Sequence, residues 1–325
     1  MKRVVILGGG GFIGGHLALR MKKQGCFVRI CDIKNHEYFD HDEICHEFII
    51  GDLRDPNVVK SVIDYETDEV YQLAADMGGA GYIFTGDNDA NVMHNSALIN
   101  LNVVDQCVKK KVKKVFYSSS ACIYPEHNQT DVDSLTCEES SAYPANPDSE
   151  YGWEKLFSER LYLAYNRNYG LDVRIARFHN VFGPYGAWCN GKEKAPAAMC
   201  RKAAETSDGG TMEVWGTGNQ TRSFLYIDEC LEAVCRFMEN DEFLGPVNIG
   251  SEEMISINDF AKMAIQISGK NIQIKNIPGP IGVNARRSDN RLYEDKIGWK
   301  VSKPLIDGMK ETFRWINDMV VKKQK

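Results

Sequence analysis

The sequence contains no long hydrophobic run, and this absence argues against a membrane protein. No segment approaches the roughly 18 consecutive apolar residues that a transmembrane helix requires. The first seven residues carry two charges, and glycines follow after only four apolar residues, which is too short for a secretory signal peptide. We therefore expect a cytoplasmic protein that makes no contact with a membrane.

The sequence also lacks an excess of positive charge. Its 39 Lys and Arg residues against 45 Asp and Glu residues give a net charge of −6, which argues against a general nucleic-acid binder. Repeats and low-complexity tracts are missing as well. The 325 residues, 43% of them hydrophobic and 26% charged, therefore predict an ordinary globular protein of about two domains.

Cysteine is abundant, but the spacing typical of metal sites is missing. The ten cysteines are scattered, and no Cys-x-x-Cys occurs among them. Six Cys and His residues lie between Cys26 and His46, yet Cys26 and Cys31 flank a predicted strand. We expect no metal site and free thiols in a reducing compartment. Whether any thiol takes part in chemistry is a separate question.

The first half of the chain alternates strand-like and helix-like segments, which indicates βαβ units and a parallel sheet. After about Asn180 the pattern changes, and glycine-rich loops at 183–194 and 277–284 alternate with expected helices at 228–239 and 256–267. An extended segment is expected at 247–250. The strands expected in the first half are 3–7, 27–31, 47–50, 69–73, 114–118 and 172–177.

A glycine-rich turn follows the first expected strand. The pattern Gly8-x-x-Gly11-x-x-Gly14 lies between that strand and a helix-compatible segment. Glycines there let a pyrophosphate approach the helix N-terminus, where free N–H groups and the helix dipole favour anions. The strand before the turn and the helix after it favour this interpretation over a turn without a ligand. In this turn, the residues predicted to bind the dinucleotide are Gly8, Gly11, Phe12, Ile13 and Gly14. Elsewhere in the chain they are Asp32, Asp52, Tyr151 and Lys155.

Acidic residues follow the next two strands. Asp32 ends the second strand, where a carboxylate accepts hydrogen bonds from both ribose hydroxyls and repels a 2′-phosphate. NAD is therefore favoured over NADP, although Lys34 lies close by. Asp52 is predicted to contact the adenine, the alternative being a surface turn residue.

These motifs predict an α/β fold, a Rossmann-type doubly wound parallel sheet with a smaller C-terminal α/β substrate-binding lobe. Residues 1–180, with later returns near 225–250, form the expected NAD-binding domain. Residues 181–325 form mainly the substrate lobe.

A tyrosine and a lysine lie four residues apart on one face of a predicted helix. Asp148 or Ser149 is expected to cap this helix, and Gly170 to end it. A tyrosine titrates near 10, so Tyr151 needs positive charge from Lys155 and from an oxidised nicotinamide to act as a base at neutral pH.

Ser120 ends a hydroxyl-rich strand and is placed to face the same substrate oxygen as Tyr151. Together with the glycine turn and Asp32, these residues resemble the extended short-chain dehydrogenase/reductase family over essentially the whole chain. The resemblance implies that Ser120, Tyr151 and Lys155 move a proton while NAD takes a hydride. It also implies a homodimer.

More specific stretches resemble one branch of that family, the GDP-mannose 3,5-epimerases. These enzymes need an acid/base pair, because oxidation at C4 makes the hydrogens on C3 and C5 acidic. The resemblance implies that Cys122 and Lys194 are this pair, without saying which is acid and which base at each carbon. From the residues alone, the alternative interpretations are that Cys122 is a small buried hydrophobic residue and that Lys194 is a charged residue of a loop. The stretches are 74–81, 118–126, 177–180, 193–198, 220–224 and 277–280.

The same resemblance implies a set of residues for a GDP-sugar substrate. Lys202 and Arg286 suit its diphosphate, and Glu193 is placed to orient either Lys194 or the sugar. His179 is a further candidate base, but a buried structural histidine is the favoured interpretation. The implied substrate-binding residues are Gly78, Gly79, Ser120, Asn180, Glu193, Lys194, Lys202, Gln220 and Arg286.

Four positions depart from the pattern of the branch and leave the sugar open, namely Tyr143, Lys192, Asn219 and Asn284. GDP-mannose, converted to GDP-L-galactose, GDP-L-gulose or both, is the favoured substrate, and a GDP-heptose is the alternative.

Other activities of the family explain fewer residues. A 4-epimerase leaves Cys122 and Lys194 without a role. A 4,6-dehydratase requires an acid pair where this chain has Ala121 and Cys122, and a 4-keto-sugar reductase requires NADPH, which Asp32 disfavours. A nucleotide-sensing protein without catalysis would not need the proton-transfer residues.

Overall fold

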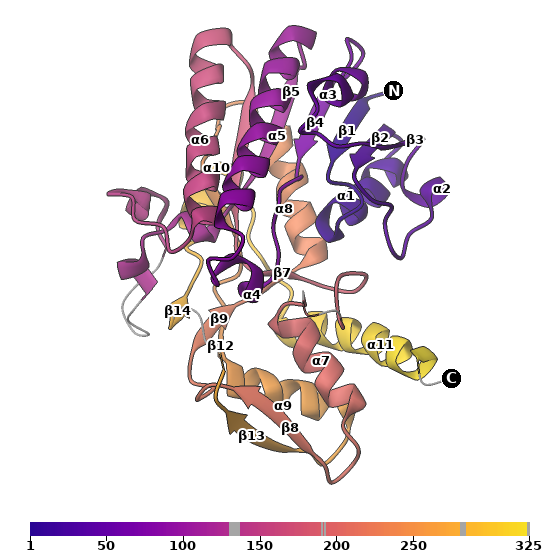
Figure 1. The fold of residues 1–325 in the computed structure, drawn as a ribbon, viewed down its shortest axis with the longest axis vertical. Coiled ribbons are helices and arrows are strands. Elements are labelled where there is room, and N and C mark those ends of the chain that lie inside the picture. Colours follow the sequence, from indigo (N-terminus) through magenta and orange to yellow (C-terminus); the bar gives the residue numbers. More distant parts are fainter. Residues whose placement is uncertain (130–136, 190, 192, 280–283, 324–325) are drawn as a thin grey trace.

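A single large parallel sheet forms the centre of the computed structural model, which describes residues 1–129, 137–189, 191, 193–279 and 284–323 (Figure 1). Lys192 and Pro280, named in the sequence patterns above, lie outside these residues. The seven strands pair in parallel in the order β11-β6-β5-β4-β1-β2-β3. They are β1 (Arg3–Leu7), β2 (Phe27–Asp32), β3 (Glu47–Ile50), β4 (Glu69–Gln72), β5 (Lys114–Ser120), β6 (Val173–Phe178) and β11 (Val247–Ile249).

The apolar residues of the strands supply two cores, one on each face of the sheet. In β1, Val4 and Ile6 belong to one core and Val5 and Leu7 to the other, because successive side chains of a strand point to opposite faces. The first core also contains side chains of α1 (Phe12–Lys23) and α8 (Ile227–Glu239), and the second those of α3 (Pro56–Val62), α5 (Asp89–Lys110) and α6 (Glu150–Tyr169). Both faces are therefore covered by helices, which confirms the predicted doubly wound α/β fold.

The strand order also fixes where a ligand can enter. Because β1 lies between β2 and β4, the chain builds the sheet outward from β1 in both directions. The carboxyl ends of these strands then lead into loops that diverge, and such a crevice is where open α/β sheets bind ligands. Short helices on this side of the sheet are α4 (Ala80–Ile83), η1 (Ala121–Ile123), η2 (Glu126–Gln129) and η3 (Glu139–Ala142), whereas the short helix α2 (His41–Ile44) directly precedes β3.

A smaller lobe lies below the sheet in Figure 1, where α7, α9, β8 and β13 group together. Its strands form sheets of two or three members, β12-β9-β14, β13-β8 and β10-β7. Its helices are α7 (Ala195–Glu205), α9 (Ile257–Ser268) and α11 (Leu305–Lys323), whereas α10 (Arg291–Ile297) packs beside β11 of the large sheet. Its strands are β7 (Val181–Phe182), β8 (Thr211–Trp215), β9 (Thr221–Ser223), β10 (Leu225–Tyr226), β12 (Met254–Ser256), β13 (Gln273–Ile277) and β14 (Ala285–Arg286).

The chain crosses between the two parts more than once. Along the chain, α8 and β11 follow the lobe strands β8 and β9, yet they lie with the large sheet. The division near residue 180 remains a prediction, because hydrogen bonding between strands does not show which segments fold independently.

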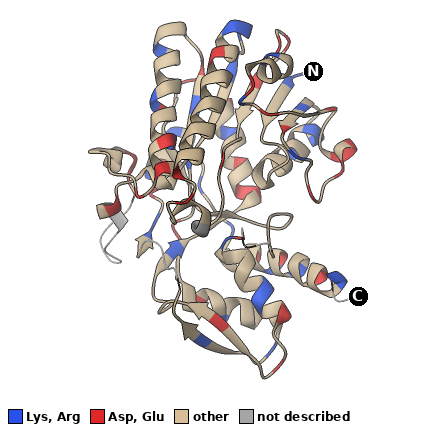
Figure 2. Cartoon of the chain, in the orientation of Figure 1, with Lys and Arg blue, Asp and Glu red and all other residues tan. Residues whose placement is uncertain are grey.

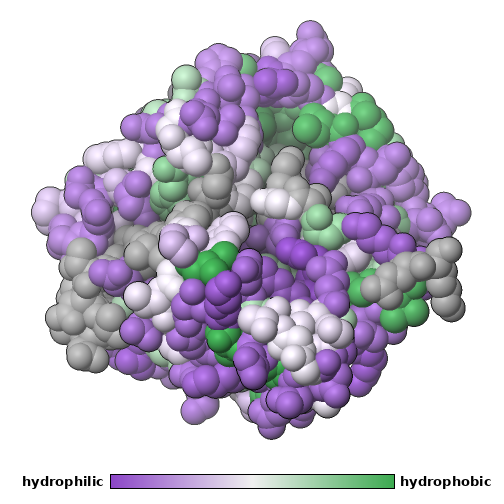
Figure 3. All heavy atoms as spheres, turned by 60° about the horizontal axis from the view of Figure 1, so that its bottom comes forward, coloured by the Kyte–Doolittle hydropathy of each residue, from purple (hydrophilic) through white to green (hydrophobic). Residues whose placement is uncertain are grey.

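The surface is polar and of mixed charge. Acidic and basic residues are interspersed along the helices of both parts (Figure 2). Seen from the lobe end, hydrophilic residues cover most of the face and separate the apolar ones (Figure 3). In the described ranges, no helix combines the length and the apolar character needed to cross a membrane.

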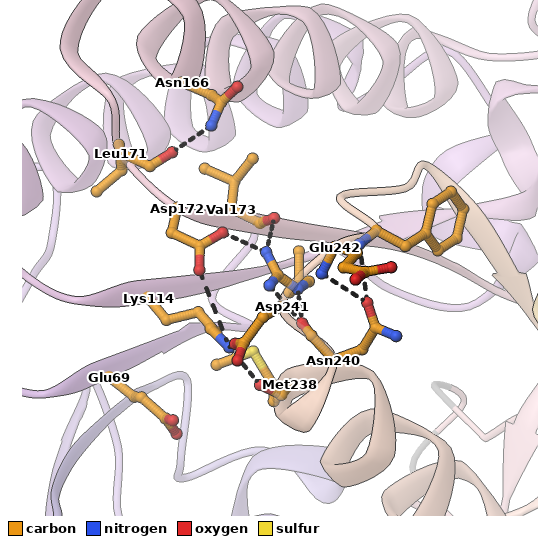
Figure 4. A network of polar contacts seen from close by, with 12 residues as sticks. Glu69, Lys114, Asn166, Leu171, Asp172, Val173, Met238, Asn240, Asp241 and Glu242 are labelled. Atoms are coloured by element: carbon orange, nitrogen blue, oxygen red, sulfur yellow. Dashed lines mark hydrogen bonds and ion pairs between the residues drawn. The ribbon is translucent and has the colours of Figure 1, made fainter. Parts of the chain in front are cut away.

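At the amino end of the sheet, buried charges connect β5 and β6 to the end of α8 (Figure 4). The Lys114 ammonium donates to the Met238 carbonyl at 2.7 Å and to the Asp241 carboxylate at 2.7 Å. The guanidinium of the fully buried Arg174 pairs with Asp172 and donates through Nε to the Asn240 carbonyl at 2.8 Å. A buried charge is tolerated only with such partners.

A second buried ion pair lies nearer the carboxyl end of the sheet and connects α6 to β6. The Arg177 guanidinium donates to both carboxylate oxygens of Glu159, at 2.9 and 2.8 Å. The Ser119 hydroxyl of β5 donates to the same carboxylate. Since both charged side chains are almost fully buried, removing one leaves the other without compensation.

We predict that Arg177→Met lowers the free energy of unfolding by ~3–5 kcal/mol, because the Glu159 carboxylate stays buried without its cation. Urea unfolding followed by tryptophan fluorescence measures the change. Lys262→Met, which removes the exposed pair with Asp259, is the control and should leave the midpoint nearly unchanged. Equal midpoints for the two variants would contradict the role of the buried pair.

Candidate active site

The turn between β1 and α1 is shaped by glycines. Gly8 has a φ of +87°, and a Cβ on Gly14 would lie 2.2 Å from the Gly8 carbonyl oxygen. The start of α1 can therefore approach the end of β1 this closely only if position 14 has no side chain. Phe12 and Ile13 begin the helix directly after Gly11. All five predicted cofactor residues of the turn thus lie at one helix N-terminus, the geometry suited to a pyrophosphate.

Asp32 lies against this turn, at the carboxyl end of β2. Its carboxylate accepts the amide N–H of Gly10 at 2.9 Å and that of Lys34 at 3.2 Å. Burial raises the pKa of Asp32, and these two hydrogen bonds partly oppose the shift. The acidic residue predicted to bind ribose and the phosphate-binding turn are therefore neighbours.

Asp52 lies in the turn after β3 and is half-exposed. Its carboxylate accepts from Arg54 Nε at 2.9 and 3.0 Å, and these hydrogen bonds lower the pKa of Asp52. Its contact with adenine stays a prediction.

The helix α6 begins and ends where the sequence predicts. Ser149 is its N-cap and accepts the amide N–H of Gly152 at 3.3 Å, and Gly170 ends the helix in the left-handed conformation. Lys155 is 2% exposed, and its ammonium donates to the Ser118 carbonyl of β5 at 2.8 Å. The same nitrogen lies 5.8 Å from the centre of the Tyr151 ring.

The charge states of this pair are set mainly by burial. Burial raises the pKa of Tyr151, as do the nearby Cys122 and Glu154, whereas the Ser120 hydroxyl opposes the shift. Burial also lowers the pKa of Lys155, against the attraction of Glu154 and Glu159. In the protein alone, burial is therefore the main influence on the pKa of Tyr151 and favours the neutral phenol. Further positive charge is needed to favour the phenolate.

Ser120 and Cys122 lie where β5 runs into η1. The Ser120 hydroxyl accepts the amide N–H of Cys122 at 3.2 Å. A Cβ on Gly152 would lie 2.1 Å from the Cys122 carbonyl oxygen, so α6 passes in direct contact with η1. Cys122 and Tyr151 belong to one buried cluster. Two residue sets predicted from different parts of the sequence thus meet at the end of one strand.

Arg286, on β14 of the lobe, contacts the sulfur of Cys122. Its Nη1 lies 3.4 Å from Cys122 Sγ, and its Nη2 donates to the Asp148 carboxylate at 2.7 Å. The sequence predicts Arg286 at a diphosphate, and that role stays a prediction. The contact with the thiol and the ion pair with Asp148 are additional to it.

Lys194 is the residue before α7, and its side chain is exposed. Protein atoms around the ammonium nevertheless desolvate it and lower the pKa of Lys194, while the charges of Cys122 and Cys230 oppose this shift. Lys194 and Cys122 are therefore within electrostatic range of each other. Glu193 accepts from Arg201 Nη2 at 3.0 Å, and its other oxygen is buried without a hydrogen-bond partner among the described residues.

Three predicted substrate residues have partners within the lobe. Lys202 Nζ donates to the Glu213 carbonyl at 2.7 Å. Gln220 Nε2 donates to the Trp215 carbonyl at 3.5 Å, and Asn180, with a φ of 42°, donates through Nδ2 to the Ser223 carbonyl at 2.9 Å. Their contacts with substrate stay predictions.

Gly78 and Gly79 lie between β4 and α4. A Cβ on Gly78 would lie 2.6 Å from Tyr82 Cβ, and the Gly79 carbonyl accepts the Tyr82 amide N–H at 2.9 Å. Both glycines thus serve a tight turn in the structure, and their contact with a sugar stays a prediction.

His179 is fully buried and lies 2.9 Å, Nε2 to Oδ1, from Asn248. Burial lowers the pKa of His179 to about 3, so the imidazole is neutral at ordinary pH. These observations fit the structural interpretation of this histidine.

All ten cysteines are free thiols, and only Cys189 is exposed. Across the described part of the chain, no group of three or more His, Cys, Asp and Glu side chains is arranged to hold a metal ion.

Asp148 is the residue that the sequence analysis missed. It appears there only as a possible helix cap, a role that Ser149 fills instead. Its partner Arg286 is 138 positions away, so no local pattern connects the two. An acidic residue directly before the cap was the only signal present.

A doubly wound sheet with a phosphate-binding turn and a Ser–Tyr–Lys set beside it is the architecture of a dinucleotide-dependent enzyme. Solved structures share the whole fold. A UDP-glucose 4-epimerase from Thermotoga maritima aligns with a TM-score of 0.85 at 21% identity, covering 98% of this chain and 100% of that one. A UDP-glucose 4-epimerase from Thermus thermophilus, solved as a complex with NAD, aligns with a TM-score of 0.81 at 21% identity, covering 97% and 99%.

The sequence comparisons are more specific. A profile of the NAD dependent epimerase/dehydratase family matches residues 4–250. The GDP-mannose 3,5-epimerase of Arabidopsis thaliana is 44% identical over 99% of this chain and 84% of its own length. The GDP-mannose 3,5-epimerase 1 of Oryza sativa subsp. indica is 44% identical over 99% and 83%. The chain therefore belongs to the NAD dependent epimerase/dehydratase family, and its cofactor is NAD.

We predict that Gly14→Ala weakens NAD binding about tenfold or more, ~1.4 kcal/mol, because the added Cβ pushes α1 away from the Gly8 carbonyl. Calorimetric titration with NAD measures the affinity. Gly209→Ala is the matched control, since a Cβ there meets no atom within 4 Å although its φ of +76° is strained. This variant should lose some stability and retain NAD affinity, and equal NAD losses in both would refute the role of the turn.

Proposed function

We propose that this chain is a GDP-mannose 3,5-epimerase, which inverts C3 and C5 of a GDP-sugar after transient oxidation at C4. The observation that carries the proposal is the position of Cys122. Its amide N–H donates to the Ser120 hydroxyl, its side chain belongs to the same buried cluster as Tyr151, and its thiol contacts Arg286. A 4-epimerase needs no thiol there. The 44% identity to GDP-mannose 3,5-epimerases supports the same conclusion.

The chemistry that bound NAD would supply is acceptance of the C4 hydride and its later return. The residues that would hold NAD are those of the glycine turn Gly8–Gly14, together with Asp32. The turn is so tight that no side chain fits at position 14. Tyr151 would accept the proton of the C4 hydroxyl, and Ser120 would hold the same oxygen. Lys155 of α6, anchored to the Ser118 carbonyl of β5, would supply positive charge close to the phenol.

With C4 as a ketone, a proton on C3 or C5 can be removed to give an enolate. Inversion then requires the proton to return from the opposite face. Cys122, at the end of β5, and Lys194, at the start of α7, belong to different parts of the fold and fit the two faces. The lowered pKa of Lys194 places more of it in the neutral form that can act as a base.

The decisive experiment incubates the NAD-loaded protein with GDP-mannose in D₂O and follows C3 and C5 by NMR. We expect deuterium at both carbons. Absence of exchange at both carbons would refute the epimerase function, and exchange with a GDP-heptose instead would identify the alternative sugar.

Cys122→Ser separates the two halves of the reaction. We expect exchange to fall by about 10²-fold or more, the size of a typical acid/base contribution. Absorbance at 340 nm on adding GDP-mannose should still show C4 oxidation. Loss of the 340 nm signal as well would mean that Cys122 serves hydride transfer instead.

We also propose a homodimer that uses α5 and α6, which lie side by side (Figure 1). Leu101 of α5 and Trp153 and Phe157 of α6 are large apolar residues with exposed fractions of 39–47%. A second copy of the chain would cover them. The proposed location is cytoplasmic, which suits the ten free thiols.

Phe157→Glu should convert the dimer to a monomer, because it introduces a charge into the apolar face. Light scattering after gel filtration measures the mass. Tyr65→Glu, at an exposed aromatic residue outside the two helices, should leave the dimer intact. A monomeric wild-type protein would contradict the proposal.

A further inference from the structure

A buried ion pair connects the two parts of the fold at the candidate active site. Asp148 directly precedes the N-cap of α6, and Arg286 lies on β14 of the lobe. Their side chains are exposed by only 7% and 9%, and the two groups are 2.7 Å apart. At such burial each charge depends strongly on the other.

The orientation of Asp148 is fixed from the helix side. Its Oδ1 accepts the Ser149 hydroxyl at 3.1 Å, and Ser149 in turn caps α6. Its Oδ2 is thereby directed to Arg286 Nη2, and the other terminal nitrogen of Arg286 contacts Cys122 Sγ at 3.4 Å. The planar guanidinium has a rigid fork of donors, so the bond to Asp148 also fixes where Nη1 points.

We propose that Asp148 is a positioning residue that holds the Arg286 guanidinium on the sulfur of Cys122. Arg286 then interacts with the acid/base thiol, in addition to its predicted role at the substrate diphosphate. The assignment of the thiol's role rests on the proposed function; the positioning of Arg286 by Asp148 does not.

The effect of the Asp148–Arg286 pair on the Cys122 thiol depends on the other charged and titratable groups that face this thiol. Arg286 touches the sulfur, and Lys194, Lys155 and Tyr151 lie within electrostatic range of it. A cation in contact with sulfur favours the thiolate, whereas a nearby carboxylate opposes it. Asp148 therefore has two opposite influences on the thiol: its own charge, and the guanidinium that it keeps in place.

The two influences predict opposite shifts in the pH midpoint of Cys122 alkylation when Asp148 is changed to Asn. The test measures the rate of iodoacetamide alkylation of Cys122 against pH, by mass spectrometry of its peptide, in the NAD-loaded protein without substrate. Cys189, the exposed thiol, is the reference within the same sample.

If Asp148 holds Arg286 in place, Asp148→Asn raises the pH midpoint of Cys122 alkylation by about one unit, the lower end of the effect of a close opposite charge. Alkylation at pH 7 then slows about tenfold relative to Cys189. A midpoint that falls or stays the same would overturn the proposal, because the guanidinium would then have stayed on the sulfur without Asp148.

Two further variants make the test specific. Arg286→Gln should raise the midpoint at least as much, and adding Asp148→Asn to it should cause no further rise. A further rise in the double variant would overturn the proposal, since Asp148 would then act without Arg286. Asp259→Asn, which removes an exposed carboxylate paired with Lys262, should leave the midpoint unchanged.

The result is separable from the epimerase assay. Alkylation requires no sugar, so a shifted midpoint together with no deuterium exchange would refute the proposed function and keep the role of Asp148. Normal deuterium exchange in the wild type, with an unshifted midpoint in Asp148→Asn, would support the proposed function and refute the role of Asp148. Retained NAD binding and circular dichroism show whether each variant is folded.

Discussion

The candidate site depends on one buried hydrogen bond, from the Lys155 ammonium to the Ser118 carbonyl. This bond holds the first turns of α6 against β5, and the contact of Gly152 with the Cys122 carbonyl holds them against η1, directly after the strand. With α6 fixed in this way, Tyr151 faces the end of β5. The start of the same helix places Asp148 where a residue of the lobe can reach it. One helix thus positions both the residues proposed for hydride transfer and the thiol.

The lobe supplies two further cations near the end of β5. Arg286 and Lys194 both come from segments after residue 180, and both influence Cys122. In the core, the buried charges of Arg177 and Glu159 compensate each other. The Arg286–Asp148 pair follows the same rule but lies at the site, where its geometry can affect chemistry. The site is therefore complete only when both parts of the chain are folded together.

Much of this could be predicted from the sequence because the signals are local. The first six strands of the large sheet lie within two residues of their predicted ends, since apolar runs bounded by turns mark them directly. The limits of α6 follow from Ser149 and Gly170 for the same reason. The partner of Asp148 and the two- and three-residue strands of the lobe could not be predicted. They depend on contacts between distant segments, which leave no periodic pattern.

The central claim is that one site removes a hydride from C4 and returns it to the same carbon while protons exchange at C3 and C5. It is tested most directly with GDP-mannose carrying deuterium at C4, incubated in ordinary water with an equal amount of unlabelled GDP-mannose of distinguishable ¹³C content. The account predicts that the epimers retain deuterium at C4, with none transferred to the ¹³C-marked molecules. Epimers that have lost the C4 label to water, or exchanged it between molecules, would contradict it.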